Sequence, residues 1–109
     1  MSEIRVGSDE SGVWREDAPH LRMHFQWSQI TRVTGAKMAG VPHARESLEF
    51  DHESGHFLEM TSGASGFYGV VGAVGRQYEL DGEWFAAVEG MGVDDPPLVL
   101  WQRDDYPSD

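Results

Sequence analysis

Cysteine is absent from this chain of 109 residues, and basic residues are scarce. Without cysteine, disulfide bonds, thiol catalysis and thiolate metal sites are excluded. Eight lysines and arginines stand against nineteen aspartates and glutamates, which gives a formal net charge of −11. Nucleic acids and anionic membrane surfaces are bound by basic surfaces, so this composition argues against both kinds of binding. The acidic excess is instead compatible with a basic protein partner.

Long apolar segments are also lacking. No apolar run approaches the length of a membrane-spanning helix, and the chain does not open with a basic region followed by an apolar one. We therefore expect a cytoplasmic protein. The length is that of a single domain, residues 1–109, in which we expect residues 1–12 and 104–109 to be loosely ordered.

The longest helical pattern lies in residues 65–88. Apolar residues recur there at intervals of three and four, which predicts a helix with one apolar stripe. A second, shorter helix with its own apolar face is expected directly afterwards, and Gly90 would end it. The stripe of the first helix consists of Phe67, Val70, Val71, Val74 and Tyr78, and the face of the second of Trp84, Phe85 and Val88.

Other segments alternate between apolar and polar residues, as strands do. The clearest covers residues 21–27, and the alternation is lost directly afterwards, which indicates a turn at residues 28–29. Further strands are expected at 12–15, 31–38, 46–51, 57–61 and 98–101. We expect the apolar side of each strand to be buried, including Leu21, Met23 and Leu98. The order of strands, helices and a last strand predicts an α+β fold: an antiparallel sheet of five to six strands with two consecutive helices packed on one face.

The segment His52-Glu53-Ser54-Gly55-His56 matches the H-E-x-x-H motif of zinc peptidases. In that motif two histidines one helical turn apart bind the metal, and the glutamate activates its water. The flanking segments alternate with a period of two, however, and a glycine suits a turn better than a helix interior. We therefore predict that residues 52–56 form a hairpin turn that binds no zinc. His52 and His56 remain candidate metal ligands, with Glu53 as the candidate base.

No other pattern predicts catalysis or a cofactor. Glycine recurs every three residues from Gly63 to Gly75, but the lysine and serine or threonine of a phosphate loop are missing. We interpret these glycines as positions of close helix packing. Neighbouring carboxylates such as Glu46 and Glu49 are expected in so acidic a chain, and the four tryptophans are interpreted as core or interface anchors. The sequence thus predicts neither a catalytic residue nor a cofactor.

The aromatic residues and the last apolar segment follow a characteristic order. Phe25-x-Trp27-Ser28 precedes a turn into Val33, and then come a hairpin, Gly66-Phe67, Trp84 and Pro97-Leu98-x-Leu100-Trp101-x-Arg103. Over about residues 20–103 this order resembles that of small bacterial proteins of unknown function, some of which are similar to pleckstrin-homology-like or toxin-immunity-like domains. The resemblance rests on structural aromatic residues and a terminal strand, and it assigns no functional residue.

These observations favour a non-enzymatic protein-interaction or binding module of the toxin-immunity or adaptor kind, with an acidic surface for a basic protein partner. The alternative is a minimal zinc-dependent hydrolase that uses His52, Glu53 and His56. A third hypothesis is a small-molecule binder with a cleft between the sheet and the glycine-rich helix. Residues 98–101 are apolar on both faces of a strand, so we also expect a homodimer.

Overall fold

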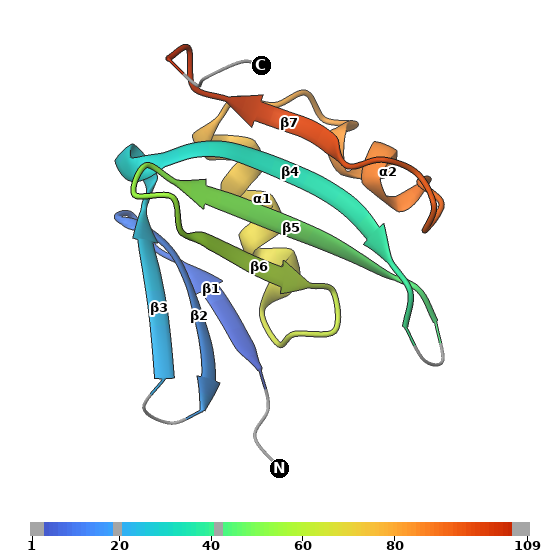
Figure 1. Cartoon of the computed structure of the whole chain (residues 1–109), viewed down its shortest axis with the longest axis horizontal. Coiled ribbons are helices and arrows are strands. Elements are labelled where there is room, and N and C mark those ends of the chain that lie inside the picture. The colour runs from blue at the N-terminus through green and yellow to red at the C-terminus, as the bar shows by residue number, and fades with distance from the viewer. Residues whose placement is uncertain (1–3, 19–20, 41–42, 106–109) are drawn as a thin grey trace.

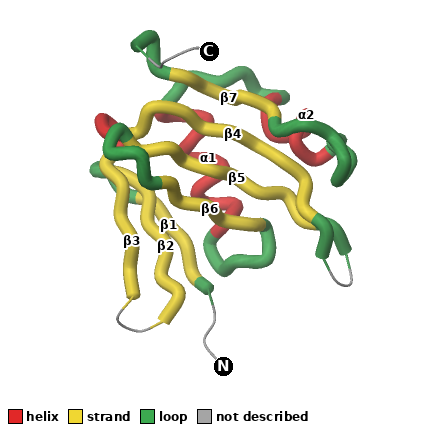
Figure 2. The backbone as a smooth tube through the Cα atoms, in the orientation of Figure 1, coloured by secondary structure: helices red, strands yellow, loops and turns green. Residues whose placement is uncertain are grey.

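The computed structural model describes residues 4–18, 21–40 and 43–105 (Figure 1). These residues form seven strands, two α-helices and one short 3₁₀ helix, so the predicted α+β class with antiparallel strands is confirmed. Figure 2 shows the strands in yellow and the helices in red. Residues 1–3 and 106–109, at the two ends predicted to be loosely ordered, lie outside the described residues.

The strands form two sheets, which corrects the prediction of one sheet with five to six strands. The first sheet has the order β1-β2-β3, with β1 at Arg5–Ser8, β2 at Gly12–Ala18 and β3 at Leu21–Gln26. The second has the order β6-β5-β4-β7, with β6 at Phe57–Thr61, β5 at Arg45–His52, β4 at Ile30–Met38 and β7 at Leu98–Gln102. All paired strands are antiparallel, and β1 lies where the sequence predicted no strand.

The chain passes from one sheet to the other at the 3₁₀ helix η1 (Trp27–Gln29). The predicted turn at residues 28–29 is therefore confirmed, but it does not pair the strands on its two sides. β4 has β5 along one edge and β7 along the other, so no edge of β4 is left for β3. The lost alternation after Trp27 marks a change of sheet.

Helix α1 (Phe67–Gln77) provides the apolar surface on which both sheets pack. Phe67, Val70 and Val74 are buried, as predicted, whereas Val71 and Tyr78 are half-buried. The residues that pack around them include Val6, Val13 and Phe25 from the first sheet and Ile30, Val33, Leu48, Phe50, Leu58 and Met60 from the second. In Figure 1 α1 lies behind β4, β5 and β6, so the face of the second sheet turned toward the viewer is not covered by a helix.

Gly66 joins the first sheet to the start of α1. Its φ of +93° lies in the left-handed region that favours glycine, and an added Cβ would lie 2.1 Å from the Val6 carbonyl oxygen. The Val6 N–H donates to the Ser65 carbonyl at 2.8 Å, and the Ser65 N–H donates to the Ile4 carbonyl at 3.1 Å. The close approach that the sequence predicted for the repeated glycines is therefore present at this position.

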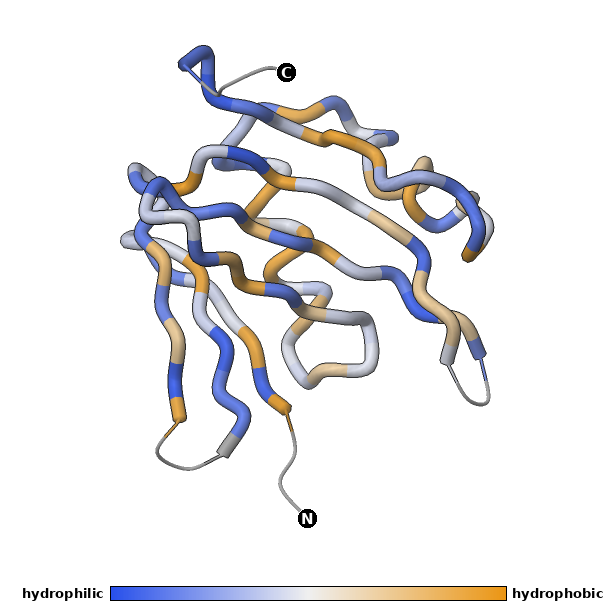
Figure 3. The backbone as a smooth tube through the Cα atoms, in the orientation of Figure 1, coloured by the Kyte–Doolittle hydropathy of each residue, from blue (hydrophilic) through white to orange (hydrophobic). Residues whose placement is uncertain are grey.

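Several apolar residues of the edge strands are more exposed than predicted. Leu21 and Met23 of β3 are 66% and 44% exposed, and Leu98 of β7 is 38% exposed. The prediction that these three side chains are buried is wrong. β3 and β7 are edge strands, and alternation identifies the apolar side of a strand without showing whether another element covers it. Figure 3 shows the same alternation, of blue and orange segments, along the central strand β5.

Lys37 ties the second helix, α2 (Trp84–Glu89), to the second sheet. Its ammonium group lies 2.7 Å from the Glu46 carboxylate and donates to the Glu89 carbonyl, also at 2.7 Å. The side chains of Lys37 and Glu46 are only 12% and 15% exposed. The hydrogen bond from Lys37 holds the pKa of Glu46 below its usual value. A cation at the last carbonyls of a helix also complements the helix dipole.

Replacing Lys37 with methionine should lower the free energy of unfolding by about 1–3 kcal/mol, because two acceptors lose a charged donor. Urea denaturation at neutral pH measures this loss. Arg5→Met is the matched control, since the 3.5 Å ion pair of Arg5 with Glu16 is exposed and should contribute less than about 1 kcal/mol. Equal losses in the two variants would contradict the role assigned to Lys37.

Candidate functional site

The H-E-x-x-H segment forms the hairpin turn between β5 and β6. The His52 N–H donates to the His56 carbonyl at 2.8 Å, and the Gly55 N–H donates to the His52 carbonyl at 2.9 Å. Gly55 has a φ of +95°, which a residue with a side chain adopts only with strain. The prediction that residues 52–56 form a turn is confirmed, so the two histidines do not have the helical spacing of a zinc peptidase.

The side chains of this hairpin have other partners. The Ser54 hydroxyl lies 2.8 Å from Nδ1 of His52 and 3.0 Å from Nδ1 of His56. The Glu53 carboxylate accepts a hydrogen bond from Arg103 at 3.2 Å. Within residues 4–18, 21–40 and 43–105, no group of three or more histidines and carboxylates is placed to hold a metal ion.

Dialysis against zinc, followed by removal of excess metal, should leave far less than one zinc ion per chain. The physical reason is that a zinc site needs a third protein ligand in tetrahedral geometry with the two histidines. Elemental analysis of the dialysed protein measures the ratio. One tightly held zinc ion that disappears in both His52→Ala and His56→Ala would revive the hydrolase hypothesis.

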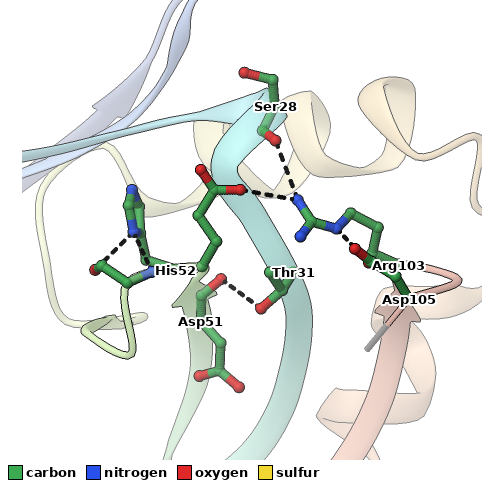
Figure 4. Close-up of polar contacts among 8 residues, drawn as sticks. Ser28, Thr31, Asp51, His52, Arg103 and Asp105 are labelled. Atoms are coloured by element: carbon green, nitrogen blue, oxygen red, sulfur yellow. Dashed lines mark hydrogen bonds and ion pairs between the residues drawn. The ribbon is translucent and has the colours of Figure 1, made fainter. Parts of the chain in front are cut away.

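Arg103, just after β7, connects this hairpin to η1 (Figure 4). Its guanidinium group donates to Asp105 at 2.6 Å, to Glu53 at 3.2 Å and to the Ser28 carbonyl at 3.5 Å. The hydrogen bonds to Asp105 and Glu53 raise the pKa of Arg103, and the hydrogen bond from Arg103 lowers the pKa of Asp105. The positive charge of Arg103 is therefore balanced by two carboxylates.

Next to Arg103, three aromatic side chains line a pocket of about 580 Å³. The Tyr78 ring stacks on Trp101 with 4.1 Å between ring centroids, and Trp27 meets Tyr78 edge-on at 5.8 Å. The Trp27 indole N–H donates to the Asp9 carbonyl at 3.1 Å. Burial raises the pKa of Tyr78, whose hydroxyl group has no hydrogen-bond partner in the described part of the chain. The sequence predicted the two tryptophans as anchors but did not predict that they share a pocket.

The uncovered face of the second sheet carries the residues that alternate with the buried ones. It has a hollow of about 380 Å³. Glu49 of β5 and Glu59 of β6 are directly opposite each other in neighbouring strands. Asp51 forms an ion pair with Arg32 at 3.2 Å. The hollow is lined by Arg32, Thr34, Ala36, Met38, Ser47, Glu49, Glu59, Pro97 and Val99.

On this face, the surroundings of Glu49 disfavour the ionised form of its carboxyl group. Its pKa is raised above 4.5, first by burial and then by the negative charge of Asp51, a hydrogen bond with Asp51 and the charge of Glu59. A group with a raised pKa in the folded state stabilises the fold at low pH, and this stabilisation is lost as the pH rises through the folded-state pKa. Arg32, which lines the same hollow and pairs with Asp51, partly opposes this rise in the pKa of Glu49.

Replacing Glu49 with glutamine should stabilise the protein at pH 7 by up to about 1 kcal/mol, because it removes repulsion between opposite carboxylates. The gain should shrink as the pH falls through the raised folded-state pKa of Glu49, because this carboxyl group is then protonated and uncharged in the folded protein. Chemical denaturation at several pH values measures the difference. Glu83→Gln, at an exposed position, is the control and should show no such trend. A Glu49→Gln gain that is equal at all pH values would refute the electrostatic cause.

A third hollow, of about 390 Å³, lies between the two sheets. The exposed side chains of Leu21 and Met23 from β3 face Phe57 of β6 there. Arg15 of β2 crosses this hollow and donates a hydrogen bond to the Glu59 carbonyl. The bond occupies a carbonyl on the outer edge of β6, which reduces the capacity of that edge to pair with another strand.

Comparison of the chain with family models, curated proteins and solved structures found no match. Among the described residues, neither helix is long and apolar enough to cross a membrane.

Proposed function

We propose that this protein is a non-enzymatic binding module whose uncovered sheet face binds a basic protein. The observation that carries the proposal is the cross-strand pair of carboxylates, Glu49 and Glu59, with Asp51 beside them. Like charges directly opposite each other destabilise a sheet. A lysine or arginine side chain placed between Glu49 and Glu59 would replace this repulsion with attraction.

The surroundings of the two carboxylates support the same proposal. Met38 and Val99 are exposed on this face and offer apolar contact to the alkyl part of a basic side chain. Thr34 lines the hollow, and its buried hydroxyl group has no hydrogen-bond partner among the residues described. With a net charge of −11, the whole protein would also attract a basic partner over a distance and speed its association.

The other hypotheses have less support. The zinc hydrolase needs two histidines and a glutamate on one helix, whereas His52, Glu53 and His56 belong to a turn. The homodimer remains a prediction: β7 is an edge strand with exposed Leu98 and Val99, which suits association with a second copy. A cytoplasmic location is the expectation for a cysteine-free acidic protein and also remains a prediction.

Calorimetric titration with an eight-residue peptide rich in lysine and arginine tests the proposed function. Binding should weaken about fivefold in the double variant Glu49→Gln/Glu59→Gln, since two exposed charge pairs contribute about 0.5 kcal/mol each. Binding should also weaken at higher salt concentration, because salt screens exposed charges.

The matched control is Glu83→Gln/Glu89→Gln, which makes the same chemical change at exposed positions before and within α2. This control should retain nearly all of the affinity. An equal loss in both double variants would mean that only the net charge matters and would reject the uncovered face as the binding site. No binding of the peptide at low salt would reject the proposal itself.

A further inference from the structure

The aromatic pocket next to Arg103 is separate from the uncovered sheet face. Its aromatic residues come from η1, from the C-terminal end of α1 and from β7. None of the residues that line it also lines the hollow on the open face. The ring contacts hold Tyr78 between Trp27 and Trp101, and the hydrogen bond to Asp9 fixes the Trp27 indole. The pocket is thus preorganised by contacts within the chain.

The charge around this pocket is negative. Glu10 and Glu79 line it and are exposed. Arg103 is the cation in the lining, and it is held by Glu53 and Asp105. Glu53 and Asp105 thus balance the charge of Arg103, and the carboxylates of Glu10 and Glu79 make the lining of the pocket net negative. The faces of tryptophan and tyrosine rings also attract cations, and tryptophan attracts them most strongly.

Glu79 has a backbone conformation that costs stability. Among the residues that the structure describes, Glu79 is the one non-glycine residue with a positive φ, which is 50°. It follows the C-terminal residues of α1, and the Leu80 N–H donates to the Gly75 carbonyl at 3.0 Å. This bond is that of a Schellman motif, in which the residue at the position of Glu79 is usually glycine. A strained position that carries a charged side chain into the lining of a pocket indicates a function for that side chain.

We propose that the pocket formed by Trp27, Tyr78 and Trp101 binds an organic cation, namely an ammonium or guanidinium group on an apolar chain, and that Glu79 is the anionic contact for it. The cation packs against the aromatic rings while its charge faces the carboxylate. A free small molecule and a basic side chain of a protein both present this group. The site does not depend on the proposed function of the sheet face, because it uses different residues.

Titration followed by NMR of the four tryptophan indole N–H signals tests this site. The probes are choline, its neutral carbon isostere 3,3-dimethylbutan-1-ol and the capped tripeptide Gly-Arg-Gly. We expect choline or the tripeptide to shift the signals of Trp27 and Trp101 with a dissociation constant of about 1–10 mM. The neutral alcohol should bind at least about threefold more weakly, because it lacks the attraction to the rings and the carboxylate. Binding of choline alone identifies a small-molecule site, and binding of the tripeptide alone identifies a peptide site.

The variants Glu79→Gly and Glu79→Gln separate binding from folding. Both should raise the dissociation constant about two- to fivefold, as expected for the loss of one exposed charge contact. Glu79→Gly should also melt at the same or a higher temperature than the parent, because glycine removes the backbone strain. Glu49→Gln/Glu59→Gln is the control and should bind the cations with unchanged affinity, whatever its effect on the basic peptide.

Three results would overturn the inference. The first is the absence of shifts in the Trp27 and Trp101 signals with both cations. The second is equal binding of choline and the neutral alcohol, and the third is unchanged affinity in both Glu79 variants.

Discussion

The burial of one face of α1 is the constraint on which the rest of the structure depends. Phe67, Val70 and Val74 occupy the space between two sheets that do not share a strand. Neither sheet could bury its apolar side alone, since three or four short strands need a second layer to cover them. Gly66 makes this arrangement compact, because β1 approaches the start of the helix more closely than any side chain would allow.

The same constraint explains why a large part of the second sheet remains open. α1 packs behind β4, β5 and β6, and α2 packs on β4 on the same side, where Val88 would lie 2.7 Å from a Cβ at Gly35. Both helices thus cover the same face of the second sheet. The polar residues that alternate with its core residues form the opposite, uncovered face. The acidic character of that face follows from Glu49 and Glu59, which the alternation of β5 and β6 places outside the core.

Regular periodicity allowed much of the fold to be predicted. The alternation around Phe50 and Leu58 and the apolar stripe of α1 depend only on neighbours within one element, and these elements formed as expected. The turn at residues 52–56 was predictable for the same reason, since the alternation on both sides outweighed the H-E-x-x-H match. The separation into two sheets was not predictable in this way, because it depends on which strands occupy the edges of β4.

The candidate sites were harder to predict, because each joins residues that are far apart in the sequence. Trp27, Tyr78 and Trp101 meet only when η1, the end of α1 and β7 come together, and each alone resembles an ordinary core residue. One local signal was present: a helix that ends near Tyr78 is followed by Glu79 where glycine is usual. The pairing of Glu49 with Glu59 required the register of the β5–β6 hairpin.

Both candidate sites carry features that oppose stability. Glu49 ionises next to two other carboxylates, and Glu79 adopts a left-handed backbone conformation. A glutamine at the first position and a glycine at the second would relieve these costs with a single substitution each. Residues that oppose the stability of the fold tend to occur at functional sites, where they serve as binding groups. Here each such residue places a carboxylate in the lining of a hollow: Glu49 beside exposed apolar residues and Glu79 beside aromatic rings. This shared chemistry, a carboxylate next to an apolar surface, is complementary to a positively charged group on an alkyl chain.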